Sequence, residues 1–590
     1  MAIAAALASV APAVAVEPTA GVAEGTAPVV QRLTSTGRRS LVDLAAGTVG
    51  HTPSAPAGGP RVLPGLRREH SLRAAETGFG AVSVPDPPTT PVEAAGPGFS
   101  GLPGLRAADS LFANANEVDA EPPDHALCVG AGRVVQAVNL AITVYSDGDP
   151  RNQFVPAIPL SAFFAEAPEV SGSGAGRRFG TLLSDPVCLF DQDVQRFFLV
   201  VSGFGLDSQT GAPNGHSHLY LAVSATADPL GDWATFTADT GGDPADAVCP
   251  CLDDFPHIGA DASGLFVSAN RFALSGDAFA GAKVHAVSKR TLAGAAAATA
   301  PVPPLVVTIS PGPAGGQPAF TLQPAITPPG APFAPDREYL LSAPNPTTAS
   351  DNRIVLWALS NTSSLDSPRP SLRLSKAIIP SLVHVEPPPI VQKPGPTPLG
   401  AQVGEPPGLL DSGLDEFSEA PVLAAGRLWA AMGTEVQASP GEAPRAGVLW
   451  LSVEPSFRSG QVRGRILSQG YLAVDGDSLL YPSVAVNARG RGAMVMTVAG
   501  PGRYPSAAYV AMGPSGPVGS VRIAAEGVAP EDGYSCYAAF VFPVGPCRWG
   551  DYSAARVDEH GDVWMGVEYI PPLARAVGEN WGTFVGQLQP

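Results

Sequence analysis

Residues 548–552, with the sequence RWGDY, place an arginine, a tryptophan, an aspartate and a tyrosine together, and Glu568 ends the next alternating apolar stretch. A guanidinium can bind a substrate carboxylate, and a tyrosine hydroxyl beside a carboxylate base can act as a nucleophile. Two carboxyl groups that flank a glycosidic bond supply the acid and the base of its hydrolysis. The predicted catalytic residues are therefore Arg548, Asp551, Tyr552 and Glu568. The structural alternative pairs Arg548 with a neighbouring carboxylate and packs Trp549 in a core.

Acids, and in one case a tyrosine, also stand immediately before a series of alternating apolar stretches. The positions concerned are Asp124, Asp185, Asp254, Asp336, Glu419, Tyr481 and Asp551. In a closed repeat fold such positions would surround one opening, where carboxylates bind a hard cation such as calcium or hydrolyse a bound substrate. The predicted cation ligands are Asp124, Asp185, Asp254 and Asp551. The alternative is that each acid caps its own turn by accepting hydrogen bonds from backbone N–H groups.

The elements that must position these residues are hairpins. Three segments share a polar entry, an alternating strand, a turn and a second alternating strand; they start near 254, 481 and 551. Weaker copies start near residues 124, 185, 336 and 418. Asp, Asn and Gly tolerate the positive φ that tight hairpin turns need, so the pattern predicts β-hairpins.

Seven such units, spaced 61 to 82 residues apart, predict an all-β fold and a seven-bladed β-propeller, with six or eight blades as alternatives. The innermost strand of each blade then lines a central channel. We expect the last strand, residues 583–588, to pair with N-terminal chain and close the ring.

Composition agrees with many short strands. The 590 residues include 66 Gly and 64 Pro, and only 15% are charged, which argues against helical bundles, while 45% apolar residues supply a core. The formal net charge of −18 argues against a nucleic-acid or anionic membrane surface, because both require clustered Lys and Arg. We therefore predict no nucleic-acid partner.

The N-terminal part divides into two segments by composition. Residues 1–16 are predicted to be a signal peptide, since they contain an apolar run with small residues at its end. Residues 17–97 lack a sustained period of 2 or 3.6 and are predicted to be a disordered, low-complexity linker or propeptide-like segment. Residues 98–590 form the predicted propeller domain. No later run reaches the roughly 18 apolar residues of a membrane helix, so we expect a secreted monomer, extracellular or periplasmic, without a membrane span.

The cysteines support an oxidising compartment. All six lie in the predicted propeller, and an even number suits disulfides. Cys536 and Cys547 enclose a short loop and are predicted to pair with each other. Cys249 and Cys251 are predicted to be tied elsewhere.

Several segments together resemble a family of large secreted bacterial β-propeller proteins. They read EPPDHALCVGAGRVVQAVN (121–139), SDPVCLFDQD (184–193), DDFPHIGADASGLFVSANRF (253–272) and RWGDYS with a following EY and NWGTFVGQL (548–588). The resemblance covers nearly all of 98–588 in the same order and implies a propeller fold and export. It leaves the chemistry open. The sequence departs from that family at His125 and in the Pro-rich loop near residue 400.

The RWGDYS segment is also similar to what sialidase-type propellers use. That resemblance implies a guanidinium for the substrate carboxylate, a tyrosine nucleophile activated by Glu568, and an aspartic acid as proton donor. Such enzymes need three arginines, for which Arg271 and Arg353 are available beside Arg548.

From these observations we predict a propeller that binds an extracellular glycan or a surface protein at the channel mouth. The predicted ligand-binding residues are Asp124, Asp185, Asp254, Arg271 and Trp549. The alternatives are a sialidase-like glycoside hydrolase or polysaccharide lyase, and a structural module of a cell envelope. Calcium is the one cofactor that the acids suggest.

Overall fold

The computed structural model describes residues 20–22, 27–48, 84–113, 120–147, 153–172, 176–242, 249–274, 278–299, 302–344, 350–437, 443–541, 545–572, 575 and 578–590. The predicted signal peptide at 1–16 lies outside these residues. No helix among them is long and apolar enough to cross a bilayer.

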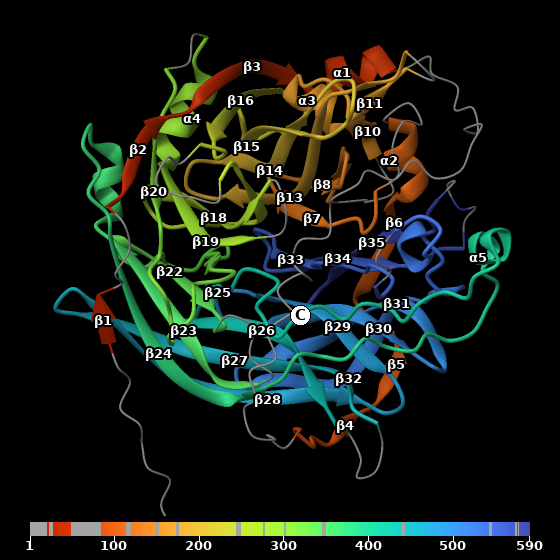
Figure 1. The fold of residues 1–590 in the computed structure, drawn as a ribbon. Helices are drawn as coiled ribbons and strands as arrows, with labels where there is room; N and C mark the ends of the chain where they lie inside the picture. The colour runs from red at the N-terminus through yellow and green to blue at the C-terminus, as the bar shows by residue number, and fades with distance from the viewer. Residues whose placement is uncertain are drawn as a thin grey trace, which may run out of the picture.

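Seven antiparallel sheets surround a central axis (Figure 1). The chain is a seven-bladed β-propeller, as the repeat spacing predicts. Blades 1 to 3 consist of β7 (Ala126–Gly130), β8 (Arg133–Val138), β9 (Ala141–Ser146) and β10 (Gln153–Pro159); β13 (Thr181–Asp191), β14 (Arg196–Leu206), β15 (Pro213–Ser224) and β16 (Asp232–Asp239); and β17 (Cys251–Ala260), β18 (Gly264–Ala273), β19 (Phe279–Ser288) and β20 (Leu305–Ile309).

The other four blades complete the circle. Blades 4 to 7 consist of β21 (Gln323–Pro324), β22 (Arg337–Ser342), β23 (Asp351–Ser360) and β24 (Arg373–His384); β25 (Val422–Ala424), β26 (Arg427–Val436), β27 (Arg445–Arg458) and β28 (Gln461–Val474); β29 (Ser478–Val486), β30 (Gly492–Gly500), β31 (Arg503–Gly513) and β32 (Gly516–Ala525); and β33 (Ala554–Val557), β34 (Val563–Tyr569) and β35 (Gly582–Leu588). A separate pair is formed by β11 (Val170–Ser171) and β12 (Arg178–Phe179). Helical segments are α1 (Leu41–Thr48), α2 (Ala107–Ala113), α3 (Leu160–Phe164), α4 (Lys289–Ala297), α5 (Pro398–Val403), η3 (Thr362–Asp366) and η4 (Tyr534–Cys536).

The hairpins form because the turn residues accept a left-handed backbone. Between β7 and β8, Ala131 and Gly132 have φ values of 50° and 75°, and Ala425 and Gly426 repeat this geometry between β25 and β26. Two successive positive φ values are typical of the tight turns whose twist matches that of antiparallel strands.

The ring closes through the seventh blade. Its outer strand is β6 (Phe99–Arg106), which pairs antiparallel with β35. The two strands come from segments far apart in the sequence, and Thr583 Oγ1 donates to the carbonyl of Leu105, 478 residues away, at 2.7 Å. The predicted closure by N-terminal chain is confirmed.

Residues of the predicted linker at 17–97 also join the blades. Fifth strands are added to blades 4, 3, 2, 5 and 6 by β1 (Ala20–Val22), β2 (Val29–Arg32), β3 (Thr34–Ser40), β4 (Thr89–Thr90) and β5 (Val92–Ala94), in that order. Among the described residues of this segment, those of β1 to β5 are edge strands and those of α1 are helical, which the prediction of a disordered linker did not include. The sequence analysis missed them because an edge strand needs no buried face, so no alternating pattern marks it.

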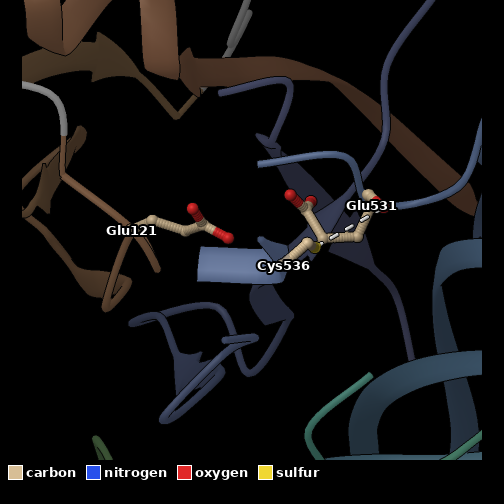
Figure 2. Close-up of side chains that lie close together, drawn as sticks. All are labelled: Glu121, Glu531 and Cys536. Carbon is tan, nitrogen blue, oxygen red and sulfur yellow. Dashed lines mark hydrogen bonds between the residues drawn. The ribbon is translucent and has the colours of Figure 1, made fainter. Parts of the chain in front are cut away.

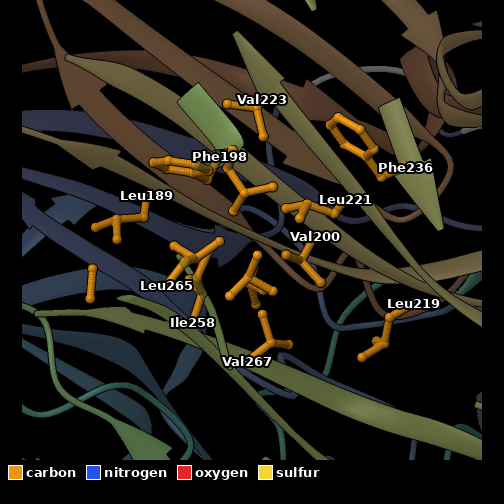
Figure 3. Packing of buried hydrophobic residues seen from close by; sticks show 14 of the residues in the cluster. Leu189, Phe198, Val200, Leu219, Leu221, Val223, Phe236, Ile258, Leu265 and Val267 are labelled. Carbon is orange, nitrogen blue, oxygen red and sulfur yellow. The ribbon is translucent and has the colours of Figure 1, made fainter. Parts of the chain in front are cut away.

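The core is divided among the interfaces between blades. Figure 3 shows the interface of blades 2 and 3, where Phe198, Val200 and Leu221 pack against Ile258 and Leu265. Most tryptophans belong to such interfaces or to the closing blade; side chains with less than 2% exposure include Trp233, Trp357, Trp429, Trp549, Trp564 and Trp581. Burial of large aromatic rings supplies much of the free energy that holds neighbouring blades together.

All six cysteines form disulfides. Cys128 and Cys188 join the innermost strands of blades 1 and 2. Cys536 pairs with Cys547, as predicted. The prediction for Cys249 and Cys251 is wrong, because these two pair with each other. Three disulfides fit an extracellular or periplasmic protein.

The fourth blade begins earlier than its sequence copy indicated. Its innermost strand is β21, and Asp336 lies in the segment leading to β22, where it is exposed and its Oδ1 accepts a hydrogen bond from the N–H of Ser363. The prediction that Asp336 belongs to the channel ring is therefore wrong. The strand at 323–324 contains a proline and is very short, so it gives no alternating signal.

Candidate functional site

One backbone feature recurs at the mouth of the channel. In six blades a non-glycine residue with φ between 43° and 56° precedes or interrupts the innermost strand; these residues are Asp124, Asp185, Phe255, Thr321, Tyr481 and Asp551. A left-handed conformation is uncommon for residues with a side chain and marks a constrained segment. The acidic members of this ring are Asp124, Asp185 and Asp551, so part of the predicted carboxylate ring exists.

Asp254 is displaced from that position by one residue. The equivalent residue in blade 3 is Phe255, which has the positive φ and the place in the bulge of β17 that Asp185 has in the bulge of β13. The prediction that Asp254 shares the position of Asp185 and Asp551 is wrong for this reason. When the two bulges are aligned, Asp254 corresponds to Ser184.

Polar side chains link three of the ring positions to the preceding blade. The N–H of Asp185 donates to Asn139 Oδ1 at 2.8 Å, and the N–H of Phe255 donates to Asp185 Oδ2 at 3.0 Å. The N–H of Thr321 donates to Asn270 Oδ1 at 2.8 Å. The carboxylate of Asp185 thus caps the next blade's segment rather than its own turn, and the ring is held by a relay of inter-blade hydrogen bonds.

The acids of the ring affect one another. Burial raises the pKa of Asp124 well above its usual range, and the charges of Asp551 and Asp185 raise it further. Arg548 opposes this shift and is itself bonded to Asp551 through Nη2. The guanidinium and the three aspartates therefore form one electrostatic unit at the channel mouth.

A cavity opens beside this unit, between blades 5, 6 and 7. About 400 Å³ of space lies there, open solvent included, and the lining includes Ser412, Glu416, Ser418, Tyr481 and Asp551. Hydroxyl groups, two carboxyl groups and an aromatic ring thus face one space.

Glu416 is the unusual acid of this cavity. Its side chain is buried, and burial raises its pKa to about 8, with further contributions from the charges of Asp415 and Asp551. Glu416 is therefore protonated at neutral pH, whereas Asp551 is held against the Arg548 guanidinium. Two carboxyl groups with such different environments are the arrangement by which acid and base roles are divided in many hydrolases.

The predicted nucleophile is not arranged as in a sialidase-type site. The hydroxyl of Tyr552 donates to the carbonyl of Pro186 at 2.9 Å, and burial raises its pKa well above the usual range. Glu568 accepts from the N–H of Gly550 at 2.7 Å, and burial raises its pKa as well. The Tyr552 hydroxyl and the Glu568 carboxyl group are thus each bonded to a backbone group, and the predicted pairing of the two stays a prediction.

The two further arginines that a sialidase-type site would need are paired with acids elsewhere. Arg271 lies on β18 in an ion pair with Asp253 at 3.1 Å, and Arg353 lies on β23 in an ion pair with Asp351 at 2.6 Å. Both guanidinium groups are therefore paired with acids of their own blades. Trp549, a predicted ligand-binding residue, is buried and its Nε1 donates to Thr497 Oγ1 at 3.2 Å, which matches the structural alternative.

The channel interior carries a buried ion pair. Arg556 Nη1 lies 3.3 Å from Glu419 Oε2. Burial lowers the pKa of His125 and of His257 to about 3, and the charge of Arg556 lowers both further. Both imidazoles are therefore neutral at physiological pH.

The predicted calcium ligands are not gathered around one point. Among the described residues, the donor atoms that lie within 4.8 Å of one another are those of Glu121, Glu531 and Cys536. Figure 2 shows the carboxyl groups of Glu121 and Glu531 facing each other, with Cys536 beside them. Asp124, Asp185, Asp254 and Asp551 are thus spread over the mouth, because each is fixed to a different blade.

Sequence reasoning missed Glu416, Glu121 and Glu531. Glu416 lies in the acidic run Asp411, Asp415, Glu416 and Glu419, which precedes the fifth blade and was the available signal. Glu121 belongs to the EPPD motif, and Glu531 lies in the PEDG sequence of the loop after β32. The proximity of Glu121 to Glu531 depends on ring closure, which brings the first and last blades together.

Among known proteins, no family model and no curated relative matches this chain. Solved structures with a similar fold include a GH43 β-1,3-galactosidase in complex with galactodeoxynojirimycin, at 11% identity, covering 59% of this chain and 94% of that chain with a TM-score of 0.27. The N-terminal domain of Nup159 has 9% identity, covering 86% and 100%, with a TM-score of 0.29. An endo-1,5-α-L-arabinanase from Thermotoga petrophila has 11% identity, covering 79% and 98%, with a TM-score of 0.23. At these identities and scores the likeness concerns the fold and carries no argument about activity. The resemblance to a secreted bacterial family stays a prediction.

Proposed function

We propose that this propeller binds an extracellular carbohydrate in the cavity at the channel mouth. The observation that carries the proposal is the lining of that cavity, where Ser412, Ser418, Glu416, Tyr481 and Asp551 face one space. Sugars present apolar ring faces and many hydroxyl groups. A tyrosine ring can pack against such a face, and carboxyl and hydroxyl groups can donate to and accept from sugar hydroxyls.

The state of the two carboxyl groups supports this ligand class. A protonated Glu416 donates a hydrogen bond, whereas the Asp551 carboxylate accepts hydrogen bonds. The cavity therefore offers both a donor and an acceptor to a sugar hydroxyl group. Sites that contain a few placed polar groups in a concave surface are typical for small organic ligands.

Substitution of Asp551 tests the proposal. Asp551→Asn keeps the shape of the side chain but removes its charge, and we expect at least a tenfold loss of affinity, since a charge-assisted hydrogen bond contributes roughly 1.5–3 kcal/mol. The measurement is calorimetric titration with the polysaccharide selected by an array of neutral and acidic glycans. Asp185→Asn is the matched control, because Asp185 occupies the same position in blade 2 and does not line the cavity. Equal affinity for both variants, or no glycan bound by the wild type, would contradict the proposal.

A second candidate function is glycoside hydrolysis, favoured by the presence of Glu416 and Asp551 in one cavity. In this reaction Glu416 donates a proton to the leaving oxygen, and the Asp551 carboxylate is the second carboxyl group, which serves as base or nucleophile on the other side of the bond. This assignment replaces the predicted pair of Tyr552 and Glu568, whose side chains are bonded to backbone groups instead.

Glu416→Gln distinguishes the hydrolase from the binder. Loss of a general acid reduces turnover by about 10²- to 10⁴-fold, while the amide preserves the size of the side chain and most of the affinity. Release of reducing sugar and ligand affinity are measured on the same preparation. Turnover that persists in this variant would exclude Glu416 as the acid, and binding without turnover in the wild type would leave the binder alone.

A further inference from the structure

Two buried carboxyl groups face each other where the ring closes. Glu121 is 3% exposed and Glu531 is fully buried, and a carboxyl oxygen of each lies within 4.8 Å of the other and of the Cys536 sulfur. Figure 2 shows both carboxyl groups pointing into the same space. Because Cys536 is disulfide-bonded to Cys547, its sulfur is not a thiolate, and oxygen atoms are the donors that remain.

The loop at 531–536 is shaped around these groups. The N–H and the hydroxyl of Ser535 donate to Glu121 at 3.1 and 2.7 Å. The N–H of Gly533 donates to Glu531 Oε1 at 2.5 Å. A Cβ at Gly533 would lie 2.4 Å from Glu121 Oε2, so a glycine is required for the close approach. Backbone and hydroxyl donors thus fix one side of each carboxyl group.

One oxygen of the pair has no hydrogen bond. Among the described residues, the buried Oε2 of Glu531 has no partner, although the same carboxyl group is bonded through Oε1. A buried oxygen without a partner is strongly unfavourable. Burial raises the pKa of Glu531 well above its usual range, and the charge of Glu121 adds to this.

Nearby cationic side chains are bonded to other acids. Arg575 Nη1 donates to the carboxylate of Asp532. Its Nη2 donates to the backbone carbonyl of the same residue at 2.6 Å. Arg548 is bonded to Asp551. The charge of Arg575 also lowers the pKa of Glu531, but burial and the charge of Glu121 outweigh it.

We propose that Glu121 and Glu531 bind a divalent hard cation, with calcium as the physiological candidate. Carboxylate oxygens are the ligands that calcium prefers, and the geometry around calcium tolerates ligands from different segments. Glu121 precedes blade 1, and Glu531 lies between blades 6 and 7. A cation here links the two ends of the ring, at a place separate from the four acids predicted at the channel mouth.

The test compares the full-length chain, freed of metal by a chelator, with the same protein after addition of calcium at pH 7.4. Calcium at about 100 times its Kd should raise the Tm of the wild type by roughly 2–5 °C, because a ligand that binds only the folded state stabilises it. Glu531→Gln should lose at least tenfold in calcium affinity by calorimetric titration and lose the Tm shift at the same concentration.

Glu169→Gln is the matched control. Glu169 is also buried and also has an oxygen without a hydrogen bond among the described residues, but its pKa is raised to about 8 by burial without a second carboxyl group. This variant should keep the full calcium response. Elemental analysis of the dialysed wild type provides a measurement that does not depend on folding of a variant; about one calcium per chain supports the site. Less than one tenth of a calcium per chain, or an unchanged calcium response in Glu531→Gln, would overturn the proposal, and a pair that shares a proton would then explain the structure.

Discussion

A chain that begins at residue 107 is expected not to fold. Removal of 1–106 deletes β6 and leaves β35 with an unpaired edge in the blade that closes the ring. It also removes Leu105, whose side chain is 2% exposed and whose N–H donates to Gln136 Oε1 at 3.1 Å. The loss of one strand and one blade interface exceeds about 5 kcal/mol, which is comparable with the whole stability of many domains.

A chain that begins at residue 98 is the control, because it keeps β6 and loses the outer strands β1 to β5 and the helix α1. It should unfold cooperatively, with a lower Tm than the full chain. Circular dichroism and gel filtration of both truncations measure the difference. Restoration of the shorter chain by a peptide of residues 98–106, and not by a scrambled peptide, would identify strand pairing as the cause. A shorter chain that unfolds sharply within a few degrees of the control would contradict this account of closure.

Stability should fall as the pH rises from 6.5 to 8. Burial raises the pKa of Glu169 and of Glu416 to about 8 in the folded protein, above the ordinary value near 4.5. Their contributions are complete below pH 4.5 and are lost as the pH rises to 8, because the folded state holds protons that the unfolded state has released. At about 1.4 kcal/mol per pKa unit, the two groups together reduce the free energy of unfolding by about 4 kcal/mol between pH 6.5 and pH 8.

The histidines set the lower limit of this window. The pKa values of His125 and His257 are lowered to about 3, so these groups add stability as the pH rises toward 6.5 and change nothing above it. Urea denaturation at pH 6.5, 7.2 and 8.0 measures the fall. In Glu169→Gln the fall should be smaller by about half of that amount, since this substitution removes one of the two acids. A free energy of unfolding that stays level or increases across the window would show that these carboxyl groups are ionised in the folded protein.

The sequence predicted the architecture better than the site because each blade is encoded locally. Alternating apolar residues and turn residues occur within a single hairpin, and so the blades and the closing strand at 583–588 could be predicted. The second blade illustrates this, because the alternation of β13 and β14 and the turn between them all lie within residues 181–206.

The site depends on residues that meet only when the ring is closed. Asp551 was predicted because it begins a repeat, but its cavity partner Glu416 comes from the irregular segment before blade 5. Asp254 lies one residue before the position equivalent to Asp185, which Phe255 occupies, and the hydrogen bond from Tyr552 to Pro186 gave that tyrosine a structural role. Spacing along the chain carries no information about any of these three outcomes.

The pairing of β6 with β35 also determines when the ring can close during synthesis. A ribosome releases β6 before any blade exists, whereas its partner strand emerges after all the other blades. Until then the growing chain is an open arc with exposed strand edges at both ends, which can pair with other chains. Closure must bring together segments separated by 478 residues, so contacts of this range form slowly and late. A propeller of this topology therefore depends most on protection from aggregation in the interval between release of β6 and arrival of β35.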